Sequence, residues 1–366
     1  MSIRILQVLD KISIDSGVSV VVMNFYRHLD HKKVIFDFMV NEDVDLATRL
    51  YIEERGSRIF VMPELKLKNL FKYIRSLTSF FKNSNYLIIH GHVSNSALFY
   101  LGLAKRVPIR IIHSHSSKLS DVLWKRSRNW ILTRFIKCVA NEFVACSEEA
   151  GQALFGKKKD FLIIDNAIDV VKFLFHAEKR QSVRSELGFS NEYLIGHVGR
   201  FVTVKNHFFI LDVFSELYKL NSNARLLLIG DGELKDKIIK QIKVLEISEF
   251  VSVLSPSEEI EKYLCAIDVL ILPSQFEGLG LIAVEAQAAG LPVLVSEYVP
   301  VKVNVTDGVE RLKLDKWIWV ESLNMATNNF DRVNRGKKVQ GSVFDISVQS
   351  QKLLDYYMKL IGSRAE

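Results

Sequence analysis

Two glutamates, Glu277 and Glu285, stand eight residues apart in the stretch "DVLILPSQFEGLGLIAVEAQAAGLPVLVS". The stretch has the pattern of a strand, a loop and a helix, with Glu277 in the loop and Glu285 inside the helix. Gly278 and Gly280 bracket the helix start, where backbone N–H groups without intrahelical partners suit a phosphate. Because a phosphate repels a carboxylate, we expect Glu277 to bind sugar hydroxyls beside it. The alternative is that Glu277 only complements the helix dipole and that Glu285 is an ordinary helix glutamate.

A second loop, in "GHVGRFVTVKNHFFILDVF", carries two cations. Arg200 directly follows an expected strand, and Lys205 and Asn206 stand at the start of the next helix. Cations at a helix N-terminus oppose the dipole, so this placement favours a bound anion such as a diphosphate. The alternative is a pair of solvated loop charges. A third strand-to-helix turn, "LIGDGELK", contains Gly230 and Gly232, but tight turns in any α/β protein use glycine.

Four histidines follow two expected strands of the first half of the chain. His90 and His92 stand in "IIHGHVS", and His113 and His115 stand in "IIHSHSS". A single histidine at a strand end is more often packed or solvated than catalytic. Four of them at two neighbouring strand ends favour a site. Gly17, in "DSGVSVVV", opens the first helix and either approaches a ligand or only turns the chain.

The elements that position these residues are short β-rich runs alternating with longer helical patterns. This alternation predicts an α/β fold with parallel sheets wrapped by helices. Two doubly wound domains in tandem would bind ligands at the carboxyl ends of their strands. The expected strands are 3–9, 34–40, 58–63, 86–92, 109–115 and 142–147 in the first series, and 193–199, 224–232, 250–255, 268–274 and 291–296 in the second.

The chain is long enough for two cores, with 366 residues of which 48% are hydrophobic. We place the first domain at 1–167, the second at 168–345 and a terminal amphipathic helix at 346–366. The three cysteines, at positions 138, 146 and 265, follow no metal or redox spacing, so we expect buried, reduced thiols. The N-terminus lacks a signal-peptide pattern, and no apolar run approaches the roughly 18 residues of a spanning helix. We therefore expect a cytoplasmic protein.

The positive charge is concentrated in the first half. Residues 1–165 contain 25 Lys and Arg against 16 Asp and Glu, whereas the remainder contains 24 against 26. This imbalance favours an anionic partner for the first half, and no nucleic-acid-binding signature accompanies it. Two basic segments with aromatic residues, 65–82 and 124–137, either lie peripherally on an anionic membrane or pack an apolar stripe on the sheet with lysines in water.

These motifs together resemble a retaining glycosyltransferase of the GT-B type, family 4 of the sequence classification, in which two Rossmann-like domains face a cleft. Capsular and exopolysaccharide transferases of bacteria are the members that it resembles most. The resemblance covers essentially the whole chain and implies transfer of a hexose or N-acetylhexosamine from a nucleotide diphosphate sugar, with UDP as the expected nucleotide. It also implies a lipid-linked saccharide acceptor, a terminal helix that crosses back to the first domain, and neither a metal nor a cofactor. The motifs that carry it are "DSGVSVVV", "HGH", "HSHSS", "ACSEEAG", "IDNAID", "GRFVTVKNH", "LLLIGDGELK" and the E-x7-E stretch.

The resemblance also implies roles for the residues above. Arg200 and Lys205 would bind the donor diphosphate and stabilise the charge that develops on the leaving group, in place of a metal. Glu277 would hold sugar hydroxyls and Glu285 the ribose hydroxyls, while His115 would lie near the donor sugar and the acceptor. Further donor contacts would come from Gly17, Asn206, Gly230, Gly278, Leu279 and Gly280, and the acceptor side would include His92 and His113.

Other functions are weighed against this one. A GT-A transferase would need a D-x-D metal site, but Asp43 and Asp45 in "NEDVD" fit a helix-capping cluster better. A dinucleotide enzyme is disfavoured because no expected strand is followed by G-x-G-x-x-G. A sugar-nucleotide epimerase of the same architecture and a non-catalytic scaffold subunit stay open. A homo-oligomer is equally open.

Overall fold

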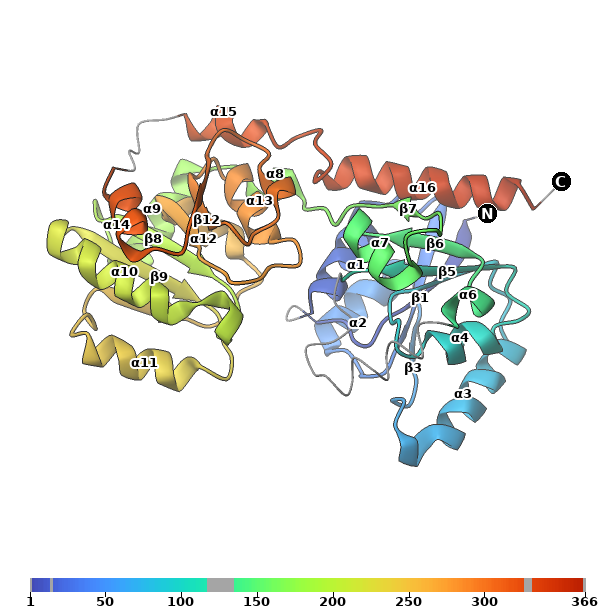
Figure 1. Cartoon of the computed structure of the whole chain (residues 1–366). Helices are drawn as coiled ribbons and strands as arrows, with labels where there is room; N and C mark the ends of the chain where they lie inside the picture. Colours follow the sequence, from blue (N-terminus) through green and yellow to red (C-terminus); the bar gives the residue numbers. More distant parts are fainter. Residues whose placement is uncertain (1, 14–15, 117–134, 326–330, 365–366) are drawn as a thin grey trace. The chain divides into compact units, whose positions relative to one another are not determined.

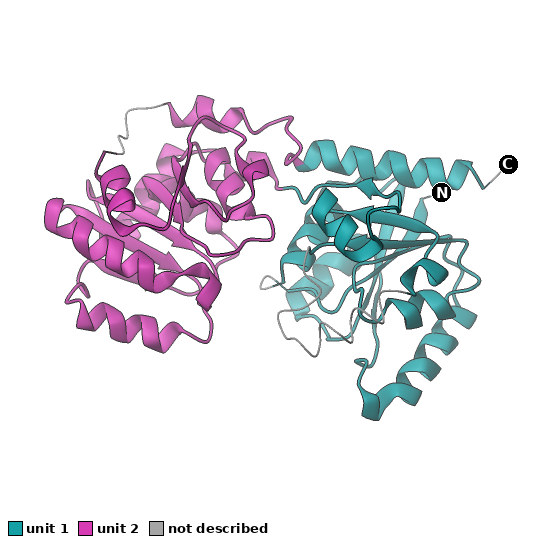
Figure 2. Ribbon diagram, viewed as in Figure 1, with its two compact units in different colours: residues 1–167, 346–366 teal, residues 168–345 magenta. Residues whose placement is uncertain are grey.

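The computed structural model describes residues 2–13, 16–116, 135–325 and 331–364. The chain divides into two compact units (Figure 2). Unit 1 comprises residues 1–167 together with 346–366, and unit 2 comprises residues 168–345. The terminal residues thus belong to the same unit as the first half of the chain.

Unit 1 is built on a sheet of seven strands in the order β3-β2-β1-β4-β5-β6-β7, and every neighbouring pair is parallel. The order reverses beside β1, as in a doubly wound sheet. Its strands are β1 (Ile3–Val8), β2 (Val34–Val40), β3 (Ile59–Val61), β4 (Ile88–Gly91), β5 (Ile109–Ser114), β6 (Glu142–Ala145) and β7 (Leu162–Ile163).

Helices cover both faces of this sheet. One face packs an apolar core against α3, α4, α6 and α7. On the opposite face, α1 contacts α16, the red helix of Figure 1. The described helical elements of unit 1 are α1 (Gly17–His28), α2 (Leu46–Glu53), the 3₁₀ turn η1 (Leu67–Asn69), α3 (Leu70–Lys82), α4 (Ala97–Leu103), α6 (Ile136–Val139), α7 (Glu148–Phe155) and α16 (Ile346–Gly362).

Unit 2 repeats the arrangement with six parallel strands in the order β10-β9-β8-β11-β12-β13. These strands are β8 (Tyr193–Val198), β9 (Ala224–Ile229), β10 (Val251–Leu254), β11 (Val269–Leu272), β12 (Val293–Ser296) and β13 (Val309–Leu312). One face carries α8, α9, α12 and α13. The other carries α10, α11 and α14.

The described helical elements of unit 2 include short turns at strand ends as well as full helices. They are α8 (Val170–Phe173), α9 (Ala177–Glu186), η2 (Thr203–Lys205), α10 (His207–Leu220), α11 (Lys235–Val244), α12 (Ile260–Ala266), α13 (Leu281–Ala288), η3 (Val301–Val303), α14 (Lys316–Met325) and α15 (Arg332–Lys337).

The prediction of two doubly wound parallel sheets is confirmed, and all eleven expected strands are present. The sequence did not reveal β7 and β13, because β7 has two residues and β13 places charged Glu310 and Arg311 inside a four-residue strand. The capping interpretation of "NEDVD" is also confirmed, since Asp45 accepts from the Thr48 amide and caps α2.

The expectation of buried cysteines is wrong for Cys138, which is exposed in the short α6, whereas Cys146 and Cys265 are buried. Within the described ranges, no helix combines the length and the apolar character needed to cross a bilayer. Most of the basic segment 124–137 lies outside the described residues.

Candidate active site

Two loops of unit 2 meet where neighbouring strands β8 and β11 end. The Gln275 amide donates to the Val204 carbonyl at 2.8 Å, and Asn206 Nδ2 donates to the Pro273 carbonyl at 3.2 Å. Asn206 has φ 61°, a left-handed conformation that asparagine tolerates better than most residues, and it ends η2 where α10 begins. These contacts fix Lys205 on one loop opposite Glu277 on the other.

Lys205 and Glu277 form an ion pair at the meeting point of the two loops. Lys205 Nζ donates to Glu277 Oε1 at 2.6 Å, and Ser274 Oγ donates to the same oxygen at 2.6 Å. The Lys205 side chain is 17% exposed and the Glu277 side chain 8%, so solvent screens the pair only partly. The sequence predicted a bound anion such as a diphosphate beside Lys205. In this structure the Glu277 carboxylate lies there, and the bound diphosphate stays a prediction.

The start of α13 lies directly after this pair. Its N-cap, Gly280, has φ 84°, a left-handed conformation that favours glycine, and no side chain caps the helix. A β-carbon on Gly278 would meet no heavy atom of the described residues within 4 Å. The first N–H groups of α13 therefore stand beside Glu277 without a capping side chain, which is the arrangement that binds a phosphate.

Glu285 lies half-buried in the second turn of α13. Burial raises the pKa of its carboxyl to about 7, with Lys172 acting in the opposite direction. About half of the Glu285 side chains are thus protonated at neutral pH in the ligand-free protein. A ligand that donates two hydroxyl hydrogen bonds would favour the ionised form.

Arg200 follows β8 and is exposed. Among the described residues, its guanidinium has no hydrogen-bond or ion-pair partner, so it can bind an anion without breaking an existing contact. Gly230 has a structural reason to be glycine, because a β-carbon there would lie 2.0 Å from the Gly199 carbonyl oxygen. The β9–α11 loop packs directly on the β8 loop at this point, and a donor contact by Gly230 stays a prediction.

Four histidines of unit 1, at positions 90, 92, 113 and 115, converge on one face of the sheet at the ends of β4 and β5. His92 Nδ1 lies 2.7 Å from His115 Nε2, and His90 Nε2 lies 3.2 Å from His113 Nδ1. Burial, followed by the neighbouring imidazoles, keeps the pKa values of His90, His92 and His113 well below 6.5, and burial lowers that of His115 to about 4. The cluster is therefore neutral at physiological pH.

Gly17 is exposed at the first position of α1, and its expected ligand contact stays a prediction. Ser16 Oγ caps that helix by accepting from the Ser19 amide. The capped end leaves fewer N–H groups for a ligand than the uncapped start of α13.

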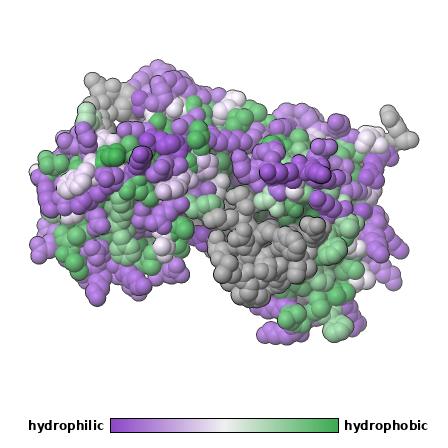
Figure 3. Space-filling model, viewed as in Figure 1, coloured by the Kyte–Doolittle hydropathy of each residue, from purple (hydrophilic) through white to green (hydrophobic). Residues whose placement is uncertain are grey.

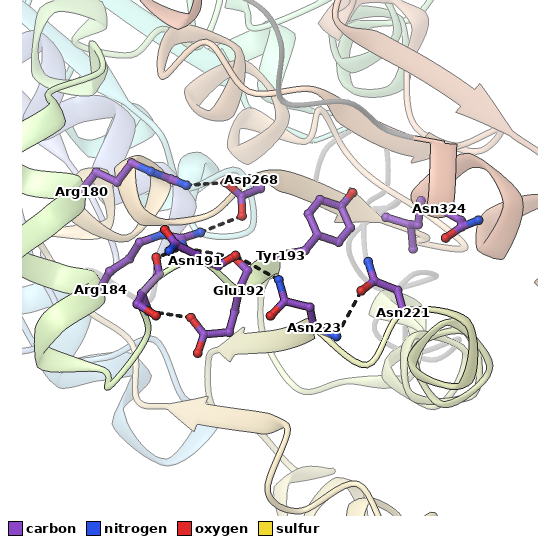
Figure 4. Close-up of a pocket in the computed structure, with 11 residues that line it drawn as sticks. Arg180, Arg184, Asn191, Glu192, Tyr193, Asn221, Asn223, Asp268 and Asn324 are labelled. Carbon is purple, nitrogen blue, oxygen red and sulfur yellow. Dashed lines mark hydrogen bonds and ion pairs between the residues drawn. The ribbon is translucent and has the colours of Figure 1, made fainter.

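A hollow of about 440 Å³ lies at the amino ends of the unit 2 strands, the edge of the sheet opposite to the Lys205–Glu277 pair (Figure 4). Arg180 and Arg184 each bind Asp268 at 2.6 Å, and both donate further to backbone carbonyls. With their donors engaged in this way, the two arginines stabilise the structure. The remaining lining residues are Ser190, Asn191, Glu192, Tyr193, Asn221, Asn223, Leu323 and Asn324.

Sequence reasoning did not identify Ser274, Gln7 and Tyr357 as parts of these sites. Ser274 stands three residues before Glu277 at the end of a predicted strand, a position that could have indicated it. Gln7 is the one uncharged polar residue in the strand "IRILQV", and a polar side chain on a buried strand needs a partner. Tyr357 comes from α16, and nothing in its local sequence distinguishes it from a core tyrosine.

Comparisons with known proteins agree with this geometry. The model of glycosyl transferases group 1 matches residues 179–324, and that of glycosyltransferase family 4 matches residues 16–172. The chain is 32% identical to the putative glycosyltransferase EpsF of Bacillus subtilis over 88% of this chain and 87% of that protein. It is 24% identical to the UDP-Gal:alpha-D-GlcNAc-diphosphoundecaprenol alpha-1,3-galactosyltransferase of Escherichia coli over 95% of both chains.

The fold comparison gives the same result. The Anabaena protein HepE, solved in complex with UDP, superposes with a TM-score of 0.78 at 16% identity, covering 98% of this chain and all of that one. The two parallel sheets, the paired loops of unit 2 and these sequence matches lead to one conclusion: the chain belongs to the GT-B glycosyltransferases of the group 1 and family 4-like families.

Proposed function

We propose that this glycosyltransferase moves a hexose or N-acetylhexosamine from a UDP-sugar to a lipid-linked oligosaccharide in capsular or exopolysaccharide synthesis, with retention of configuration and without a metal ion. The observation that carries the proposal is the Lys205–Glu277 pair beside the uncapped start of α13. A cation, a carboxylate and free helix N–H groups at one point suit a ligand that presents both a diphosphate and sugar hydroxyls.

On the donor side, the three N–H groups of Lys205 allow it to keep Glu277 and still bind a phosphate oxygen. Arg200 adds a second cation from the same loop. As the bond between the sugar and the diphosphate breaks, negative charge grows on the leaving phosphate, and these two cations stabilise that charge more than the ground state. Glu277 Oε1 is already held by Lys205 and Ser274, which fixes the carboxylate for the sugar hydroxyls.

On the acceptor side, the neutral His115 would contact the reacting sugars through hydrogen bonds. In a retaining transfer of this type, the acceptor hydroxyl attacks on the face that the leaving group vacates. The departing phosphate oxygen takes the hydroxyl proton, so no side chain needs to act as the nucleophile. One relative supports the donor and acceptor classes, since it is a UDP-galactose transferase acting on a diphosphoundecaprenol-linked sugar.

A lipid-linked acceptor places the enzyme at the cytoplasmic face of a membrane, and unit 1 carries a surface suited to it. Leu67, in η1, is 97% exposed, and Phe71, in the first turn of α3, is 90% exposed. Lys66, Lys68 and Lys72 are exposed beside them in the sequence, with Lys66 paired to Glu64, and Figure 3 shows this end of unit 1 as hydrophobic side chains among hydrophilic ones. Exposed apolar side chains with adjacent lysines bind anionic bilayers peripherally.

The test is calorimetric titration of the purified protein with UDP-, GDP- and ADP-sugars in the presence of EDTA, followed by product analysis with a lipid-linked acceptor. We expect one nucleotide class to bind and a new glycolipid with retained configuration to form. Lys205→Ala should lose both, whereas Lys219→Ala, which removes an exposed Lys–Glu pair at the other end of α10, should lose neither.

Three outcomes would contradict the proposal. Release of an altered UDP-sugar without an acceptor would identify an epimerase. Failure to bind any donor would favour a scaffold subunit. Turnover that requires a divalent cation would refute the metal-free mechanism.

A further inference from the structure

Gln7 on β1 connects two chains of hydrogen bonds that together run through the four clustered histidines at the ends of β4 and β5. Gln7 pairs in register with His90 on the neighbouring β4. Because alternate residues of a strand share a face, Gln7 and the histidines all lie on the side of the sheet that α1 and α16 cover. The amide of Gln7 has two different ends, and each end contacts one of the chains.

The first chain leads to His115. Gln7 Oε1 lies 2.8 Å from His92 Nε2, and His92 Nδ1 lies 2.7 Å from His115 Nε2. The second chain leads to His113. Gln7 Nε2 donates to Tyr357 Oη at 3.4 Å, Tyr357 Oη lies 2.6 Å from His90 Nδ1, and His90 Nε2 lies 3.2 Å from His113 Nδ1.

When the imidazoles are neutral, each of these contacts determines which nitrogen of the next ring carries the proton. A neutral ring has one N–H and one bare nitrogen. Since Gln7 Oε1 can only accept, His92 must carry its proton on Nε2, and its bare Nδ1 must accept from His115 Nε2–H. His115 Nδ1 is then unprotonated. If the Gln7 amide were reversed, every proton along both chains would shift to the opposite nitrogen.

The far ends of the chains are open to a further partner. Within the described residues, His115 Nδ1 and His113 Nε2 are buried and make no hydrogen bond, and the two rings stack with centroids 4.0 Å apart. The Asn166 side chain raises the pKa of His115 against the larger effect of burial, and its Oδ1 is likewise a buried atom without a partner among the described residues. A proton on His115 Nδ1 would donate toward this oxygen, so the tautomer measurement below distinguishes the two arrangements. A buried acceptor without a partner is satisfied by a water or by a ligand hydroxyl.

A metal ion is the rival occupant, because nitrogens of His90, His92 and His113 lie within 4.8 Å of one another. Binding an ion there would break the contact between His90 and His113. The described residues that line the cavity beside the rings include no carboxylate. A buried dication would thus lack a counter-charge.

We propose that Gln7 is a positioning residue that acts through His92 to hold His115 as the Nε2–H tautomer, with Nδ1 as a hydrogen-bond acceptor for a sugar hydroxyl. This inference rests on the proposed function, in which His115 contacts the reacting sugars. Two variants test the acceptor role of Gln7. Gln7→Glu keeps an acceptor for His92, and Gln7→Met removes both the oxygen and the nitrogen of the amide while keeping a side chain of similar size.

The test is long-range proton–nitrogen NMR of the whole chain labelled with ¹⁵N-histidine, which distinguishes the two neutral tautomers, with His115→Gln to assign the signals. We expect His115 to be the Nε2–H tautomer in the unaltered protein and in Gln7→Glu, and a mixture of tautomers in Gln7→Met. Turnover should fall with the fraction of the correct tautomer, about twofold for an equal mixture, without a change in donor affinity. Gln349→Met, which alters another buried glutamine of unit 1, should change neither result.

The inference is overturned if His115 is the Nδ1–H tautomer or charged at pH 7, or if Gln7→Met leaves its tautomer unchanged. One equivalent of zinc in the purified protein, measured by mass spectrometry, would also overturn it. If Gln7→Met does not fold, the tautomer of His115 in the unaltered protein and in Gln7→Glu still shows whether the proposed proton arrangement is correct. NMR requires no turnover, so a protein that follows these tautomers but transfers no sugar would refute the proposed function and leave the proton arrangement standing.

Discussion

If Glu285 accepts hydrogen bonds from both ribose hydroxyls of the donor, as the family resemblance implies, its carboxyl must be ionised, and donor binding should then depend on pH. Burial raises its pKa to about 7 in the ligand-free protein. The ionised fraction is then about 90% at pH 8 and about 10% at pH 6. If only the ionised form binds, the apparent dissociation constant rises about tenfold between these pH values, or about 1.4 kcal/mol.

The raised pKa of Glu285 also affects the stability of the fold. The resulting change of stability with pH has the opposite sign to that caused by an ion-paired carboxylate. The unfolded glutamate has its ordinary pKa, below the folded value of about 7. Between these two pKa values the folded state binds more protons, so stability falls as the pH rises, and it levels off above pH 7. The free energy of unfolding would fall by at most about 3 kcal/mol across this pH range, and by less for a half-buried group. Glu285→Gln should remove this dependence and be the more stable protein at pH 8.

The assay is calorimetric titration with the UDP-sugar at pH 6, 7 and 8 and constant ionic strength. The UDP-sugar is preferred to UDP because the terminal phosphate of UDP itself titrates near pH 6. At pH 7, binding should release about half a proton, which two buffers with different ionisation enthalpies reveal. Glu285→Gln should bind more weakly and without a pH dependence. A flat affinity in the unaltered protein, or the same slope in Glu285→Gln, would refute the assignment of Glu285.

Changes at other residues should have effects that can be measured separately. Glu277→Gln keeps the shape of the side chain but loses its charge, so turnover should fall roughly 10- to 150-fold, the value of a hydrogen bond to a charged group, as measured by initial rates. Ser274→Ala removes one of two donors to Glu277 and should cost less, about two- to tenfold in the same assay; a larger loss than for Glu277→Gln would contradict the supporting role. The double variant Leu67→Ser/Phe71→Ser should reduce cosedimentation with vesicles of anionic lipid while leaving soluble donor binding intact. Leu220→Ser, which alters an exposed leucine of unit 2, should leave vesicle binding unchanged.

The fold could be predicted from the sequence because buried parallel strands are continuous apolar runs that end at turn-forming residues. The run "LLLI" of β9 and the run "VLIL" of β11 stop at glycine and proline, and their positions were predicted correctly. The helix α9 was not predicted, since its sequence "AEKRQSVRSE" has almost no apolar stripe and is held instead by Arg180 and Arg184, whose guanidinium groups bind Asp268.

The sequence indicated the candidate site residues one by one but not the contacts between them. The loop chemistry indicated Lys205 and Glu277 separately, yet their contact spans 72 residues of sequence. It depends on β8 and β11 being neighbours in the sheet, which the spacing of motifs does not reveal. For the same reason, the sequence predicted a histidine site without Gln7, which lies 85 residues from its partner His92.

The candidate sites of the two units differ in charge: unit 2 presents cations, and unit 1 presents neutral imidazoles. This difference matches the groups that each would bind. In unit 2, the cations Lys205 and Arg200 lie on partly exposed loops, where a diphosphate can pair with them. In unit 1, four imidazoles lie so close together and so deep that protonating one would place an unpaired charge among its neighbours. A neutral cluster cannot compete with Lys205 and Arg200 for an anion, but it retains directional donors and acceptors. Such a cluster can orient a neutral sugar hydroxyl, and the direction of its protons, set at Gln7, decides whether His115 accepts or donates.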